Sequence, residues 1–401
     1  MQGRCMQRRC MQRLYAPHHF SPHKPKMTKP RNVYHPENEP VFTSLNVNKG
    51  IEQPDAVSAD SVHRFLKKNH RRELSVDDYC EGILQGNRTV LSRAVTLIES
   101  NKPEHQSIAQ EIIGRCLPFS GKSVRIGITG VPGAGKSTFI ESFGTYLTSL
   151  GKKIAVLAID PSSERSKGAI LGDKTRMEEL SSDPNAYIRP SPSSGSLGGV
   201  ARKTRETILL CEAAGFDTVL IETVGVGQSE TVVHSMVDFF LLLQIAGAGD
   251  ELQGIKRGIM EMADLIVINK ADGDNINRSH TAATLYRNAL HLFPPTPSDW
   301  IPQVKTCSSI RKTGIGEIWQ CIEDYFELVN GNNYFDKRRS TQAKYWMFET
   351  IEENLRSNFY QNEQVREALS YLETEVTREK ISPFVAAREL LEKYFDAISK
   401  R

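Results

Sequence analysis

Long hydrophobic runs are missing from this 401-residue sequence. No stretch of 18 apolar residues occurs, and the apolar segment 238–248 is too short to cross a bilayer. Paired cysteines are missing too, because the seven cysteines are scattered and none forms a C-x-x-C metal pair. These absences argue against a membrane protein, a disulfide framework and a cysteine-ligated metal site, and they favour a reducing compartment.

Acidic residues are missing from the first 36 positions. Eight of the 51 basic residues lie there, including Arg4 and Arg8, and none of the 48 acidic residues does. An Arg-rich, acid-poor N-terminus is typical of an organelle-import presequence, although a basic tail without targeting function is the alternative. The remaining chain carries 43 basic against 48 acidic residues, a net charge of −5, which argues against nucleic-acid binding. We therefore predict a transit peptide over residues 1–36 and a linker over 37–60.

The spacing of apolar residues divides the rest of the chain into three parts. Residues 61–120 show helical spacing and form a predicted N-terminal extension. Residues 121–330 alternate strand-like and helical runs, the pattern of an α/β domain with a mostly parallel sheet and crossover helices. Residues 331–401 are charged and helical. The expected strands are 124–129, 154–159, 218–222, 239–244, 265–269 and 301–306.

Two apolar stripes run along the predicted helices of the last part. Their members recur at helical spacing: Ala343, Met347, Ile351, Leu355 and Phe359 in one stripe, and Phe384, Ala387, Leu391, Tyr394 and Ile398 in the other. Helices this amphipathic need a partner surface. The sequence leaves two possibilities open, packing on the chain's own domain or dimerisation.

The stretch 130–137 fits the phosphate-binding pattern G-x-x-x-x-G-K-[ST]. A predicted strand precedes it and a predicted helix, 138–150, follows it. Its glycines allow a tight turn whose N–H groups face an anion, and the helix N-terminus adds its dipole. Lys136 should neutralise the β- and γ-phosphates, and the Ser137 hydroxyl should ligate Mg²⁺. The predicted nucleotide contacts are Gly130, Val131, Pro132, Gly133, Ala134, Gly135, Lys136, Ser137 and Thr138.

A second motif, Asn269-Lys270-Ala271-Asp272, ends an apolar strand about 130 residues later. The carboxylate of Asp272 can accept hydrogen bonds from guanine N1–H and the 2-amino group. Adenine has no donors there and would leave a buried charge unpaired, a difference of several kcal/mol. The loop containing Ser308, Ser309 and Ile310 follows the last predicted strand, where it can touch the base. We therefore predict binding of GTP and GDP.

Carboxylates at the ends of other strands are candidate Mg²⁺ ligands. Glu222 stands where a Walker-B acid is expected, and Asp160 and Asp173 are further oxygen donors. Since Mg²⁺ takes few carboxylates directly, we expect Ser137 to ligate it, with the acids bound directly or through water. Gly225 can donate its N–H to the γ-phosphate and so sense hydrolysis.

One absence bears on the rate of hydrolysis. Small signalling GTPases place a water-orienting glutamine directly after that glycine, whereas Val226 stands there in this chain and Gln228 comes two residues later. Slow intrinsic turnover that rises with a partner is therefore expected. Lys256 lies after a glycine-rich segment and can donate to transition-state charge or pair with a partner.

Five segments together resemble the MeaB/ArgK-type P-loop GTPases. They are 130–138, Asp-Pro-Ser-Ser at 160–163, Glu-Thr-Val-Gly-Val-Gly-Gln-Ser at 222–229, Ala-Gly-Ala-Gly-Asp at 246–250, and Asn-Lys-Ala-Asp at 269–272. The resemblance runs from about Leu84 to the C-terminus and leaves out residues 1–60. It implies a P-loop GTPase fold with a helical N-terminal extension and a helical C-terminal dimerisation arm, and hence a homodimer.

The same resemblance implies a function and a set of roles. Such proteins gate adenosylcobalamin delivery to methylmalonyl-CoA mutase and protect that enzyme, driven by GTP. It also implies a mitochondrial matrix location. By position, phosphate and Mg²⁺ binding fall to Lys136, Ser137 and Glu222, metal-linked switch roles to Asp160 and Asp173, base selection to Asp272, and partner sensing to Lys256.

Two other functional classes fit the sequence less well. A metallochaperone GTPase for a metal such as nickel should show a Cys/His pair or a His-rich tract near the nucleotide, and His18, His19 and His23 lie in the predicted leader instead. A P-loop kinase would need Asp160 or Glu222 as its base and would leave the motif at 269–272 without a purpose.

Overall fold

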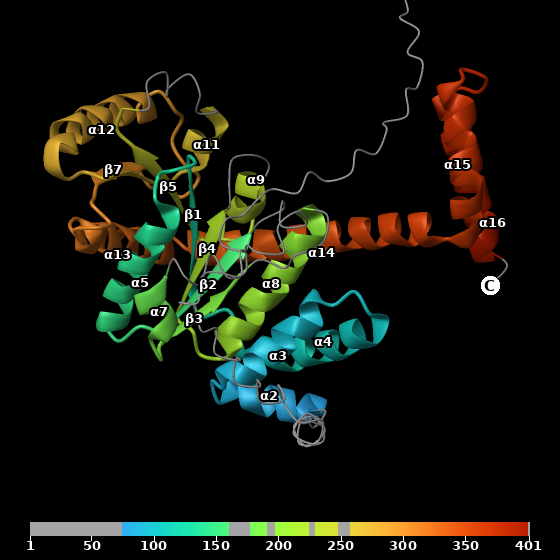
Figure 1. Ribbon diagram of the computed structural model, residues 1–401, viewed down its shortest axis with the longest axis horizontal. Coiled ribbons are helices and arrows are strands. Elements are labelled where there is room, and N and C mark those ends of the chain that lie inside the picture. The colour runs from blue at the N-terminus through green and yellow to red at the C-terminus, as the bar shows by residue number, and fades with distance from the viewer. Residues whose placement is uncertain (1–73, 160–176, 191–196, 224–228, 248–256, 400–401) are drawn as a thin grey trace, which may run out of the picture. The chain divides into compact units, whose positions relative to one another are not determined.

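The computed structural model describes residues 74–159, 177–190, 197–223, 229–247 and 257–399. Its centre is a seven-stranded sheet in the order β3-β2-β4-β1-β5-β6-β7 (Figure 1). Every neighbouring pair is parallel, so all strand C-terminal ends meet at one edge. The strands are β1 (Val124–Gly130), β2 (Ile154–Ile159), β3 (Ala186–Arg189), β4 (Thr218–Thr223), β5 (Phe239–Ile245), β6 (Leu265–Asn269) and β7 (Gln303–Thr306).

Helices precede, connect and follow these strands. Before the sheet come α2 (Val76–Leu84), α3 (Arg88–Glu99), α4 (Pro103–Cys116) and the 3-10 helix η2 (Leu117–Phe119). Between strands lie α5 (Lys136–Ser149), α7 (Glu178–Ser182), α8 (Leu197–Ala213), α9 (Ser229–His234), α11 (Arg257–Met262), η4 (Gly273–Asn275) and α12 (Ile276–Leu290). After the sheet come α13 (Ile315–Gly331), α14 (Tyr334–Gln361), α15 (Glu363–Thr377) and α16 (Pro383–Ser399).

Both faces of the sheet are buried, which explains why its strands are almost wholly apolar. On β5, Phe239 and Leu241 join a core with α5 and α13, while Phe240 joins the opposite core with α8 and the N-terminal helices. A third cluster packs α12 against β6 and β7. Within the described residues, no helix combines the length and hydrophobicity needed to cross a membrane.

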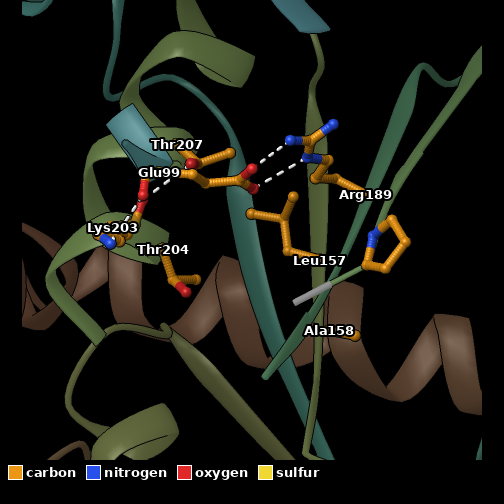
Figure 2. A pocket seen from close by; sticks show the side chains of 8 residues that line it. Glu99, Leu157, Ala158, Arg189, Lys203, Thr204 and Thr207 are labelled. Atoms are coloured by element: carbon orange, nitrogen blue, oxygen red, sulfur yellow. Dashed lines mark hydrogen bonds and ion pairs between the residues drawn. The ribbon is translucent and has the colours of Figure 1, made fainter. Parts of the chain in front are cut away.

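The N-terminal helices are fastened to the sheet at the C-terminal ends of β2 and β3. Arg189 of β3 pairs with the carboxylate of Glu99, with 2.9 Å between Nε and Oε1. Lys203 of α8 donates to the Glu99 carbonyl and to Asn101 Oδ1, both at 2.8 Å. Figure 2 shows Glu99 between these two cations, beside a small pocket lined by Leu157. One residue at the end of α3 thus joins the N-terminal helices to the sheet.

The last two helices form a separate apolar cluster. Val365 and Leu372 of α15 pack against Ala386 and Leu390 of α16. In Figure 1, α14 runs from the sheet to this pair of helices. Helix α16 begins at Pro383, and Ser382 Oγ accepts from Phe384 N at 3.2 Å.

The strands expected from the sequence are all present, with small differences at their ends. The last strand begins at Gln303, because Ile301 is 77% exposed and Pro302 has no N–H to give to a ladder. Gly86, with a φ of +73°, separates α2 from α3, and Asn87 caps α3. The four-residue edge strand β3 was not predicted.

Candidate nucleotide-binding site

The phosphate loop joins β1 to α5 at the C-terminal edge of the sheet. A Cβ atom at Gly130 would lie 2.1 Å from the carbonyl oxygen of Leu243, so only glycine fits there. Gly133 and Gly135 have φ values of +81° and +86°, which side chains disfavour. The glycines therefore allow the tight backbone conformation of this loop, in which N–H groups can point toward an anion.

Lys136 lies over this loop. Its Nζ donates to the carbonyl oxygens of Gly130 at 2.9 Å and Val131 at 3.4 Å. Burial lowers the pKa of Lys136, and the charges of Glu222 and Glu230 act in the opposite direction. The ammonium group is thus held at the mouth of the loop, within reach of a bound phosphate.

Ser137 and Glu222 meet at the start of α5. Ser137 Oγ donates to Glu222 Oε1 at 3.2 Å, and Glu222 is only 6% exposed. Next to them, Thr223 Oγ1 donates to Thr129 Oγ1 at 2.9 Å, which ties the ends of β4 and β1 together. A hydroxyl and a carboxylate are oxygen donors of the kind that Mg²⁺ takes when nucleotide phosphates and water complete its shell. The residues present therefore fit this ion.

Asn269 connects the motif at 269–272, which the sequence predicts to read the base, to the phosphate loop. Its Nδ2 donates to the carbonyl oxygen of Ala134 at 2.8 Å, and the residue is 1% exposed. Its Oδ1 accepts from the N–H and the hydroxyl of Ser309, at 3.1 and 2.8 Å. Motifs more than 130 residues apart in the chain therefore converge on one edge of the sheet.

Asp272 lies beside the last loop of this edge. Its Oδ2 accepts from Ser308 Oγ, and the preceding Lys270 has a φ of +60° that turns the chain toward the loop. The Ile310 side chain is 75% exposed at the same loop. The Asp272 carboxylate, held by one hydroxyl, can accept hydrogen bonds from the edge of a purine. The exposed Ile310 side chain can cover the face of the base.

Sequence reasoning missed Ser142, which fixes this loop from the other side. Its Oγ donates to the carbonyl oxygen of Ser309 at 2.6 Å, and it is 5% exposed. The only indication in the sequence is a small polar residue between Phe139 and Phe143 on the buried face of a helix. Its partner lies 167 positions away, which no local pattern could indicate.

Five predicted site residues fall outside the residues that the structure describes: Asp160, Asp173, Gly225, Gln228 and Lys256. Among the residues that it does describe, no three His, Cys, Asp or Glu side chains gather as a metal cluster.

Comparison with known proteins agrees with this geometry. Residues 91–364 match the family described as methylmalonyl Co-A mutase-associated GTPase MeaB. The chain is 45% identical to GTPase ArgK of Escherichia coli over 328 residues, covering 81% of this chain and 99% of ArgK. It is 45% identical over 343 residues to the mitochondrial methylmalonic aciduria type A homolog of Mus musculus, covering 82% and 83%.

A solved structure shows the same architecture. The crystal structure of a protein described as LAO/AO transport system kinase is 40% identical and superimposes with a TM-score of 0.64, covering 79% of this chain and 96% of that one. The parallel sheet, the phosphate loop and the base-reading motif are thus accompanied by similarity along most of the chain. The chain belongs to the MeaB family of P-loop GTPases.

Proposed function

We propose that this GTPase gates the loading of adenosylcobalamin into methylmalonyl-CoA mutase and protects that enzyme. The observation that carries the proposal is the match of residues 91–364 to a mutase-associated GTPase family, because that range contains both nucleotide motifs. The site supports it as well, since Asn269 bonds the base-reading strand end to the phosphate loop. The output of such a site is a change of conformation between GTP and GDP states.

Each residue of the site has a separate role in binding the nucleotide. Lys136 neutralises the β- and γ-phosphates, and Asp272 selects guanine through its N1–H and 2-amino donors. Ser137 and Glu222 would hold Mg²⁺, aided by Asp160 and Asp173. The ion would supply positive charge that offsets the negative charge of the phosphates during hydrolysis. Gly225 senses the γ-phosphate.

Slow turnover without a partner follows from Val226, which stands where signalling GTPases orient water with glutamine. Gln228 and Lys256 become effective when the mutase is bound.

The C-terminal helices support a homodimer. The α14 stripe is open to solvent in this chain, with Met347 at 53%, Ile351 at 46% and Leu355 at 59% exposure. On α16, Phe384 is 86% exposed. Apolar side chains in such a row gain stability when a second surface covers them. A mitochondrial matrix location is supported by the acid-free basic residues 1–36 and by the mouse relative.

GTP turnover measured with and without methylmalonyl-CoA mutase tests the proposal. We expect slow release of phosphate from the GTPase alone and at least about tenfold faster release with the mutase, the scale on which partners complete such sites. Lys136→Met should abolish both rates, which excludes a contaminating phosphatase. Equal rates with and without the mutase would refute the proposed partner and leave the GTPase activity standing.

A further inference from the structure

The short helix α9 lies between the phosphate site and α14. It has six residues, Ser229–His234, and it packs on β1, which leads into the phosphate loop, and on β4, which carries Glu222 near its end. A helix of six residues has little stability of its own. Its position is therefore set by the groups that hold its two ends.

The first turn of α9 contains the acidic residue Glu230. Glu230 is 1% exposed. Burial lowers the pKa of Lys136, and the negative charges of Glu222 and Glu230 oppose that effect. A shift of α9 would thus change the field at the lysine that binds phosphate.

The other end of α9 is held by the first half of α14. Trp346 Nε1 donates to the Ser235 carbonyl at 3.2 Å, and Gln342 Nε2 donates to the Val237 carbonyl at 2.7 Å. One turn earlier, Arg338 Nη2 lies 3.4 Å from His234 Nε2, which must accept because a guanidinium only donates. We call Arg338, Arg339, Gln342 and Trp346 the α14 root.

The α14 root is itself fixed by buried charges. Arg339 bonds both carboxylate oxygens of Asp238, the residue that begins the turn into β5. The Trp346 ring lies between two guanidinium groups, with Arg125 at 5.4 Å and Arg205 at 5.6 Å from its centroid. The anchor of α9 is therefore rigid, and it is built from a helix that carries no part of the nucleotide site.

We propose that the α14 root positions α9 and, through it, Glu230 relative to Lys136 for GTP hydrolysis. Trp346 and Gln342 are positioning residues, because they touch neither nucleotide nor reacting atoms and act through the backbone of residues 235–237. The proposal rests on the GTPase activity of the site and not on the identity of its partner.

The test uses the full chain with Trp346→Phe and Gln342→Met, singly and together. Each change removes one N–H donor and keeps a side chain of similar size. We expect kcat for GTP to fall about five- to tenfold in the double variant, since small misplacements at a reacting centre are costly. The Kd for GDP should change less than about twofold, because the phosphate and base contacts remain.

Trp300→Phe is the matched control. Trp300 is 7% exposed and so lies deeper than the partly buried Trp346, and its Nε1 donates to the Asp264 carbonyl at 2.9 Å, away from α9. It should lower the midpoint of thermal unfolding at least as much as Trp346→Phe and leave kcat unchanged. An equal loss of kcat in the control, or an unchanged kcat in the double variant, would overturn the proposal.

Glu230→Gln closes a double-mutant cycle. If α14 acts through Glu230, the loss of kcat caused by the α14 changes should shrink to less than about twofold in this background, whereas independent effects would multiply. Hydrogen exchange over residues 229–238 gives a reading that does not require turnover, and it should speed up in the double variant and not in Trp300→Phe. Unaltered exchange there would refute the positioning role, whereas failure of the wild-type chain to hydrolyse GTP would refute the function instead.

Discussion

Asn269 shows how much of the site depends on one side chain. Its amide group donates to the phosphate loop through Ala134 and accepts from Ser309 in the last loop. With both ends of the amide engaged and the residue 1% exposed, its orientation has no alternative that satisfies the same groups. Asn269 therefore holds the phosphate loop and the loop that contacts Asp272 in a fixed relation to each other.

Asp272→Asn tests base selection. The amide has one acceptor oxygen and no charge, so we expect GDP to bind at least about tenfold more weakly, the loss typical of a charge-assisted hydrogen bond. ADP binding should be unchanged. Isothermal titration with both nucleotides measures this.

Asp274→Asn is the control for that change, because Asp274 is exposed and only two residues away. It should leave both affinities as they are. Equal weakening of GDP and ADP in Asp272→Asn would mean that the carboxylate does not read the base.

His234 predicts a pH dependence of stability. Burial, with a smaller contribution from the charge of Arg338, lowers the pKa of His234 from 6.5 to about 4. Between these values the unfolded chain binds a proton that the native chain does not, so His234 lowers stability as pH falls from about 6.5 to 4. The effect is on the order of 3 kcal/mol at the acid end.

His234→Gln should remove this effect, which urea unfolding at pH 7.5 and pH 5 can measure. Burial also raises the pKa of Asp264 to about 6, which contributes in the opposite sense, but this contribution is common to both chains and cancels in the comparison. His291→Gln at an exposed site should behave like the wild type. A variant with the wild-type pH dependence would show that His234 is not buried as a neutral ring.

At the residue scale, the sequence predicted the groups that belong to motifs and missed those that only support them. Lys136, Ser137, Asn269 and Asp272 stand at fixed spacing within short patterns, so they could be found without a structure. Ser142 holds the same loop but belongs to no pattern, because its partner is a backbone carbonyl far along the chain.

At the scale of elements, α14 and α8 are joined through buried charges under the sheet. Glu212 of α8 accepts from Arg125 Nε at 2.8 Å, from Ser123 Oγ at 2.6 Å and from Gly121 N at 2.8 Å. Arg339 of α14 lies 3.5 Å from the same carboxylate. Burial by itself would raise the pKa of Glu212, but these hydrogen bonds and charges outweigh it and lower the pKa.

Glu212→Gln should therefore destabilise the chain strongly. It leaves the buried Arg125 without its countercharge, while Arg339 keeps Asp238, and removing one partner of a buried ion pair costs about 3–5 kcal/mol. Urea unfolding measures the loss. Glu179→Gln, which breaks the exposed pair with Lys312, should cost less than about 1 kcal/mol, and similar losses in the two variants would contradict this account.

The elements themselves differ in how well the sequence predicts them. The inner strands β1, β4 and β5 are covered on both faces, and their continuous apolar runs are therefore visible in the sequence. β3 pairs only with β2 and ends at Arg189, directly before Pro190, so it has neither the length nor the composition of an inner strand. Its position depends on tertiary contacts such as the pair with Glu99.

At the scale of the whole molecule, the exposed stripe on α14 predicts association. Leu355→Glu should weaken a dimer that buries this stripe, because a charge would be placed among apolar side chains. Sedimentation velocity at micromolar concentrations should show a shift from dimer to monomer. Glu352→Gln changes a charge on the same helix without touching the stripe and should leave the dimer intact. A wild-type monomer would refute the arrangement.

The length of α14 gives the α14 root a further significance. From Trp346 to Gln361 the helix extends about 22 Å at 1.5 Å per residue, so a rotation of about 10° at its base would swing the far end by about 4 Å. A long rod works as a lever, and its motion is largest where α15 begins. A surface bound to α15 and α16 would therefore be displaced by a movement that begins near Lys136, although it does not contact Lys136.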